Sequence, residues 1–150
     1  MKLHVERGAA GSAVRVRTRS SLLAPRILQV TPTSARVALV ATTALLLAGD
    51  EAELDIVVGD GVALEIVEVA ATVAYAGRGG ACSWSANLSM AEGASLRWPG
   101  EPFVVATDAR ATRTTRADIA DGGSLMLRDT LVLGRHGEAV SYTHLRAHET

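Results

Sequence analysis

The chain reads VVGDGVALEI at residues 57–66, and the same pattern returns as SMAEGASLRW at 89–98 and as DIADGGSLML at 118–127. In each copy an acidic residue precedes the glycine, a leucine follows three positions after it, and another apolar residue lies two positions further on. The copies are separated by about 30 residues, an interval typical of repeat architectures. The sequence therefore contains a repeated structural unit.

The spacing around the glycine predicts how this unit folds. Apolar residues stand three and five positions before it, and again three and five positions after it. Side chains alternate between the two faces of a strand, so odd offsets share one face only across an odd-length loop or an arch between stacked sheets. A two-residue type I′ hairpin is disfavoured. Glycine suits the turn because it adopts positive φ without a Cβ clash.

A unit of this size cannot bury an apolar face alone, whereas stacked units share a continuous core. We therefore expect an all-β fold, a layered stack of β-sheets similar to a β-helix or β-solenoid. Three ordinary hairpins in a β-sandwich are the alternative interpretation. Strand signals about every ten residues, separated by Gly, Asp, Pro and Ser, agree with an all-β fold.

Two kinds of strand pattern are present. Residues 83–90, SWSANLSM, alternate between apolar and polar, which predicts a half-buried antiparallel strand with Trp84, Ala86, Leu88 and Met90 on its inner face. At 57–58 and at 131–133 all neighbouring residues are apolar. These two segments are predicted to be strands covered on both faces.

Length and composition limit the class of protein. A chain of 150 residues can form one domain, and 48% hydrophobic with only 3% aromatic residues predicts an aliphatic core. Fifteen basic and sixteen acidic residues give a net charge of −1, which provides no broad positive field for nucleic acid or an anionic membrane. Cys82 is the sole cysteine, so a disulfide framework is excluded and a reducing cytoplasm fits best.

Neither the start of the chain nor its longest apolar stretch predicts export or a membrane span. The first seven residues, MKLHVER, lack the apolar run of a secretory signal. The stretch Val37 to Gly49, VALVATTALLLAG, is shorter than the roughly 20 residues a bilayer helix needs. We interpret it as two buried strands or one core segment.

The sequence contains no recognisable catalytic motif, such as a nucleophile elbow, a phosphate-binding P-loop or a zinc-hydrolase helix. His144 and His148 have the i, i+4 spacing of a metal-binding pair on a helix, but this signal is weak, and His4 and His136 are isolated. A small hydrolase or isomerase that uses Asp129 and His136 is a remote alternative, because no nucleophile motif lies near them.

Charged residues supply the remaining candidates. Arg15, Arg17 and Arg19 share one side of an extended strand, and Arg110, Arg113 and Arg116 form a second basic cluster. We interpret both sets as solvated strand faces, although either could dock an acidic partner. Asp129 stands out among the acids because it lies in the apolar stretch from Leu125 to Leu133. A carboxylate there must be paired, hydrogen-bonded, hydrated or bound to a cation, and pairing with Arg128 or Arg135 is the structural explanation.

The order of several segments resembles the urease accessory protein UreD (UreH) family, in particular its actinobacterial branch. These segments are collinear from about Ser21 to Glu138. They are SLLAPR at 21–26, LLLAGDEAELDIVVGDGVALEI at 45–66, ATVAY at 71–75, the Gly79-Gly80 turn, WPGEPFVV at 98–105 and TLVLGRHGE at 130–138.

The resemblance implies a cytoplasmic, non-enzymatic urease maturation factor with a layered β fold. Such a protein would bind UreF, through it UreG, and apo-urease, and would hold no tight cofactor while a nickel ion passes through it. Asp50, Glu51 and Asp129 match acidic positions of the family motifs, so we expect them to line a nickel path. A borderline divalent ion in transit needs carboxylates that bind it weakly enough to release it. A generic β-solenoid binding module without a metal role is the alternative function.

The resemblance also implies a truncated chain. Residues 1–138 match the N-terminal part of a UreD-like β domain, whose second half is missing here. Residues 139–150 depart from the Gly-punctuated strand pattern and are expected to be a non-native tail.

Overall fold

The structure, a computed structural model, describes residues 1–77 and 79–135. This part of the chain contains thirteen strands and no helix, which confirms the all-β prediction. The strands are β1 Lys2–Glu6, β2 Arg15–Arg19, β3 Leu23–Val30, β4 Ser34–Ala41, β5 Glu51–Val58, β6 Ala63–Glu68, β7 Thr72–Ala74, β8 Ala81–Met90, β9 Ser95–Pro99, β10 Phe103–Val105, β11 Arg110–Ile119, β12 Ser124–Arg128 and β13 Leu131–Leu133.

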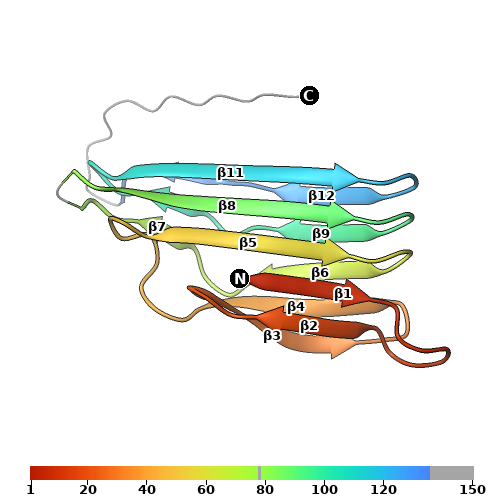
Figure 1. Ribbon diagram of the computed structural model, residues 1–150. Coiled ribbons are helices and arrows are strands. Elements are labelled where there is room, and N and C mark those ends of the chain that lie inside the picture. The colour runs from red at the N-terminus through yellow and green to blue at the C-terminus, as the bar shows by residue number, and fades with distance from the viewer. Residues whose placement is uncertain (78, 136–150) are drawn as a thin grey trace.

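The strands form three sheets. Sheet A has the order β11-β8-β5-β1-β2, sheet B the order β12-β9-β6-β4-β3, and sheet C the order β13-β10-β7. From β5 onward the chain visits sheets A, B and C in turn and then begins the next coil, so that β5, β8 and β11 lie side by side (Figure 1). Strands of successive coils pair in parallel. The prediction of a solenoid-like stack is confirmed.

The repeated glycines lie in arches that carry the chain from sheet A to sheet B. Their φ angles are 56° at Gly61, 61° at Gly93 and 67° at Gly122, a left-handed conformation that favours glycine. The amide of Gly61 donates to the carbonyl of Glu92, and that of Gly93 to the carbonyl of Asp121, so each arch is bonded to the next. The two strands that flank a glycine belong to different sheets, which excludes the hairpin interpretation of the repeats.

The first four strands close one end of the stack. β1 pairs in parallel with β5 and antiparallel with β2, while β4 pairs in parallel with β6 and antiparallel with β3. The apolar stretch from residue 37 to 49 supplies β4 and then a loop whose Leu45 and Leu46 are buried. It is therefore one strand and one core segment. Within the described residues, the structure has no helix with the length and hydropathy of a membrane span.

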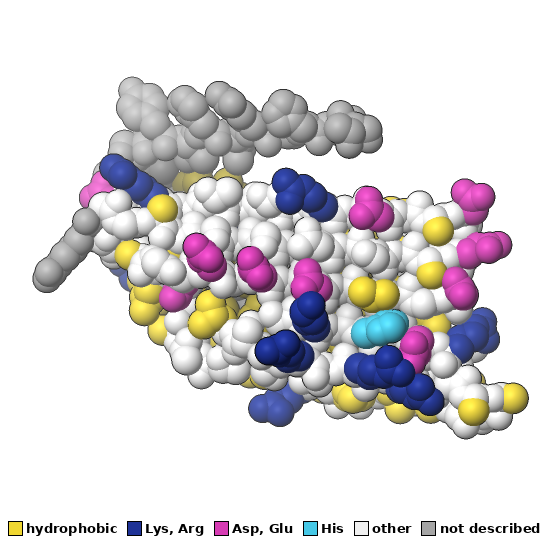
Figure 2. All heavy atoms as spheres, in the orientation of Figure 1, with side chains coloured by type: hydrophobic (Ala, Val, Ile, Leu, Met, Phe, Trp, Pro, Cys, Tyr) yellow, Lys and Arg dark blue, Asp and Glu magenta, His cyan; other side chains and the backbone are white. Residues whose placement is uncertain are grey.

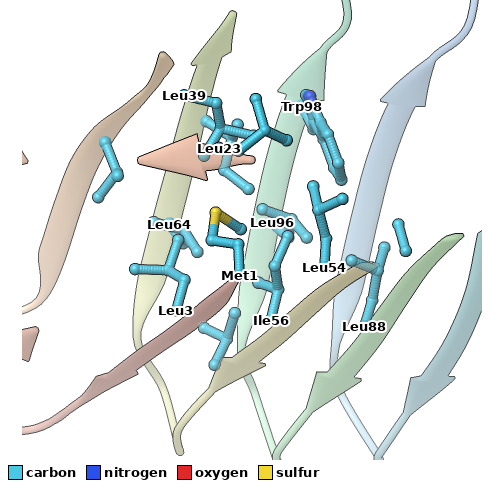
Figure 3. Close-up of a cluster of buried hydrophobic side chains, with 14 of the residues drawn as sticks. Met1, Leu3, Leu23, Leu39, Leu54, Ile56, Leu64, Leu88, Leu96 and Trp98 are labelled. Carbon is cyan, nitrogen blue, oxygen red and sulfur yellow. The ribbon is translucent and has the colours of Figure 1, made fainter. Parts of the chain in front are cut away.

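The core lies between the inner faces of sheets A and B (Figure 3). Trp84, Ala86, Leu88 and Met90 are all buried, which confirms the inner face predicted for residues 83–90. The same strand was predicted to be antiparallel, and this is wrong because β8 pairs in parallel with both β5 and β11.

The prediction that residues 57–58 and 131–133 are covered on both faces is also wrong. Val57 is 37% exposed because it points to the outer face of sheet A, opposite the buried Val58. Leu131, Val132 and Leu133 are exposed to a similar degree, since β13 is an edge strand of the three-stranded sheet C. Consecutive apolar residues in these two segments therefore do not mark strands that are covered on both faces.

Candidate functional site

Glu68, Gly100 and Asp129 occupy the same position in successive coils, at the C-terminal ends of the sheet B strands. Leu64 pairs with Leu96, and Leu96 with Leu125. Continued along the strands, this register places Glu68 beside Gly100 and Gly100 beside Asp129. Each of the three lies seven positions after a repeat glycine, an odd offset that corresponds to the inner side.

Glu68 is a partly buried carboxylate with two hydrogen bonds. Its Oε1 accepts from the indole Nε1 of Trp98 and its Oε2 from the backbone amide of Glu101, both at 2.9 Å. Gly100 fits close to the next coil, because a Cβ there would lie only 2.8 Å from the carbonyl oxygen of Arg128, whereas its distance to Oε1 of Glu68, 3.7 Å, would be an ordinary contact. Burial raises the pKa of Glu68, while the two hydrogen bonds and Arg113 act in the opposite direction and Asp129 adds to the rise.

Arg113 reaches the same region from sheet A. In the pairing of β11 with β8 it lies opposite Trp84, whose side chain is buried in the core. Its guanidinium carbon is 5.2 Å from the ring centre of Trp84 and 4.9 Å from that of Phe103, within cation–π range. Its Nε lies 3.1 Å from Oδ2 of Asp129, with side-chain exposures of 14% and 45%. Nε has no aligned hydrogen-bond partner among the described residues, so the contact is an ion pair.

A hollow of about 160 Å³ lies next to this cluster. Glu68, Trp84 and Tyr75 line it together with residues of β3, β4, the loop after β4 and the segment 69–73 that leads into β7. The buried indole Nε1 of Trp84 has no hydrogen-bond partner in the described part of the chain. The site thus combines two carboxylates, one guanidinium, aromatic rings and an unpartnered N–H donor.

Comparison with known proteins gives the family. The model of the UreD urease accessory protein family matches residues 1–150. The chain belongs to this family. Urease accessory protein UreD 1 of Streptomyces griseus is 46% identical over 135 residues, which cover 89% of this chain and 53% of that protein.

Two further UreD relatives give the same result. Urease accessory protein UreD of Frankia casuarinae is 40% identical over 123 residues, 81% of this chain and 39% of its own length. The protein of the same name from Streptomyces avermitilis is 33% identical over 132 residues, 87% of this chain and 52% of its own length. The chain thus spans about half the length, or less, of these curated relatives.

The structure separates the acids that the UreD resemblance selected. Asp129 belongs to the cluster with Arg113, whereas Arg128, one of the partners considered for it, donates to the carbonyl of Gly100 instead. Asp50 lies in the turn before β5, where its Oδ2 accepts from the amide of Leu47 at 2.9 Å. No hydrogen bond or ion pair joins Asp50 or Glu51 to Asp129 among residues 1–77 and 79–135.

Glu51 begins an acidic row on the outer face of β5. Glu51, Glu53 and Asp55 alternate with the buried Ala52 and Leu54, and Figure 2 shows acidic side chains across the middle of this face. Asp55 contacts Lys2 at 3.6 Å. Within the described residues, no group of three or more His, Cys, Asp and Glu side chains is close enough to hold a metal ion. Glu51 is therefore a surface acid in this structure.

Two members of the cluster, Arg113 and Glu68, are not identified by the sequence patterns. Arg113 was interpreted as part of a solvated basic face with Arg110 and Arg116, which is wrong because it is an odd number of residues from its neighbours in that set and points inward. Glu68 is not among the acids that the sequence patterns select. Extending the odd offsets from the repeat glycine by one step, to position seven, would have selected it.

The remaining candidates from the sequence do not join this cluster in the described part of the chain. Arg15 and Arg17 both contact Glu6, at 3.4 and 2.8 Å, in agreement with a solvated strand face. His136, His144 and His148 lie outside the described residues. The structure therefore does not test the His144–His148 metal pair or the hydrolase hypothesis that uses Asp129 and His136. The expected tail at 139–150 also lies outside.

Proposed function

We propose that this chain acts in urease maturation, as the β-solenoid part of a non-enzymatic cytoplasmic scaffold that passes nickel to apo-urease. Membership of the UreD family supports the connection to urease. UreF is the proposed direct partner, UreG is recruited through it, and no cofactor is held tightly. Neither nucleic acid nor a membrane is a proposed partner.

The observation that carries the nickel role is the placement of Glu68 and Asp129 at one repeat position, two coils apart, with Gly100 at that position in the coil between them. Nickel is a borderline ion for which isolated carboxylates are weak oxygen ligands, so two such groups can hold it briefly without trapping it. We propose that Asp129 lines the route and that Asp50 and Glu51 belong to another part of it. The rigid stack would hold these groups at fixed spacing.

A generic β-solenoid binding module is the second candidate. Such modules commonly recognise ligands on exposed aromatic side chains. Here Trp84, Trp98 and Phe103 are buried, and Tyr75 is the most exposed aromatic residue in the described part of the chain. The structure therefore favours a scaffold over a module of this kind.

Co-purification tests the proposal. A full-length protein that contains this sequence should be recovered with UreF and apo-urease from cells that express all three. A second UreD protein that binds both partners serves as the positive control. Failure to recover either partner under the conditions in which the control recovers them would contradict the proposed function.

A further inference from the structure

Arg113 places a positive charge at the inner side of the last described coil. Its guanidinium contacts two aromatic faces, and its Nε lies 3.1 Å from a carboxylate oxygen of Asp129. An arginine cannot lose its charge by deprotonation in a protein, so this position always holds a cation. Any other cation that binds Asp129 must share the carboxylate with the guanidinium or displace it.

Glu68 is the second carboxylate near Arg113. It occupies the equivalent position two coils away, and Arg113 is close enough to lower its pKa. Gly100 stands between Glu68 and Asp129, and its lack of a side chain keeps that interval open. The positive charge of one guanidinium thus offsets the repulsion between two carboxylates.

The neighbouring hollow gives a hydrated ion room to approach. A volume of about 160 Å³ exceeds the roughly 10–15 Å³ that one water needs, so the hollow has room for several waters. Glu68 lines the hollow, and so does Trp84, whose buried N–H lacks an acceptor among the described residues. Water or the hydration shell of an ion would supply that acceptor.

We propose that Arg113 is an internal counter-ion that competes with the transported divalent cation for Asp129 and Glu68. Without the cation, the guanidinium pairs with Asp129 and neutralises the site. When the cation arrives, it takes the carboxylate and the guanidinium stays against the rings of Trp84 and Phe103. Arg113 thereby weakens cation binding and favours release. The inference rests on the proposed function, because that function supplies the cation.

Equilibrium dialysis of the purified 150-residue chain against Ni²⁺ tests this competition. Arg113→Gln removes the charge, and Arg116→Gln, an exposed position on the same strand, is the matched control. We expect Arg113→Gln to lower the Kd for Ni²⁺ by about fivefold to tenfold, the range for a close and partly buried charge pair, while Arg116→Gln leaves it near the original value. Adding Asp129→Asn to the Arg113→Gln variant should remove the increase in Ni²⁺ affinity.

The direction of the change separates competition from a structural role. A residue that only packs the fold would leave Ni²⁺ binding unchanged or weaken it when replaced. Unchanged or weaker binding by Arg113→Gln, or no Ni²⁺ binding by either protein, would overturn the inference. Arg113→Lys keeps the charge and should restore a Kd close to the original one.

A second measurement needs no variant, and so does not depend on whether Arg113→Gln folds. Ni²⁺ is paramagnetic and broadens the NMR signals of nearby protons. The Nε–H signal of Arg113 should broaden at lower Ni²⁺ concentration than that of Arg97, which pairs with Glu65 on the surface. An Arg113 signal unaffected at saturating Ni²⁺ would contradict the inference. Loss of UreF and urease binding would defeat the proposed function but leave both Ni²⁺ results unaffected.

Discussion

Glu68 is a carboxylate that the fold removes partly from water, and two hydrogen bonds offset only some of that cost. Burial is the main cause of its raised pKa. A carboxyl group whose pKa is higher in the folded state binds its proton more tightly there than in the unfolded chain. Its contribution to stability is therefore complete below about 4.5, the ordinary value, and is lost as pH rises through the folded pKa.

Glu68→Gln should remove this pH dependence. The free energy of unfolding of the variant, relative to the original protein, should rise with pH above about 4.5 and then level off, because glutamine does not titrate. Urea unfolding at a series of pH values measures it. Identical profiles for the two proteins would show that Glu68 is not perturbed by the fold.

Trp98→Phe tests how a hydrogen bond affects the pKa of Glu68. It keeps the aromatic ring but removes the indole N–H that donates to Oε1 of Glu68 at 2.9 Å. That hydrogen bond favours the charged carboxylate, so its loss should raise the pKa of Glu68 further and extend the pH dependence to higher pH. NMR titration of the Glu68 carboxyl carbon checks the direction, and a lower pKa would contradict the account.

At this scale the sequence predicts part of the cluster. Asp129 is recognisable because it interrupts an apolar stretch, but its partner Arg113 lies in another sheet and no local pattern connects them. The sequence around Glu68 contains both charged and apolar residues, so the inner position of Glu68 cannot be recognised from its neighbours. Which charges meet across the interior depends on how the coils stack, and this is set by long-range register.

The arches show what the repeat dictates at the scale of elements. Odd apolar offsets on both sides of the glycine predict either an odd-length loop or an arch between sheets, and the connections from β5 to β6, β8 to β9 and β11 to β12 are all arches between sheets. The N-terminal strands carry no repeat signal. Parallel pairing of β1 with β5 could not be predicted, because a single strand pattern does not specify its neighbour.

The second arch offers a direct test. Gly93 has a φ of 61°, and a Cβ built there would lie 3.8 Å from the Cα of Gly61, an ordinary contact. Gly93→Ala should therefore lower the free energy of unfolding by about 1–2 kcal/mol through backbone strain alone. Gly93→Asn should cost less, because asparagine tolerates this conformation better. Equal losses for both variants in urea unfolding would contradict strain as the cause.

At the scale of the whole molecule, the two ends of the described stack differ in how their edge strands pair. At one end the edge strands β2 and β3 pair antiparallel with β1 and β4 (Figure 1). At the other end β11 and β12 have a neighbour on one side only, and Ile119 is 45% exposed although it follows the inner-face pattern. The third repeat therefore stabilises the core less than the second.

Alanine substitutions at two inner-face positions measure this gradient. Leu88 is fully buried on β8, so Leu88→Ala should lower the free energy of unfolding by about 2–5 kcal/mol. Ile119→Ala on β11 should cost less than about 1 kcal/mol, because much of that side chain is already in water. Comparable losses at the two positions, measured in urea, would show that the last coil is as well packed as the middle one.

The central proposal concerns carboxylates inside the solenoid, which we propose pass nickel to urease. The most direct measurement is the nickel content of urease purified from nickel-limited cells that contain a full-length protein with Asp129→Ala, with Asp118→Ala on the outer face of β11 as the control. We expect Asp129→Ala to lower nickel per urease by about tenfold, the scale on which lost metal contacts act, while UreF and apo-urease still co-purify. Urease with the same nickel content in both variants would contradict the account.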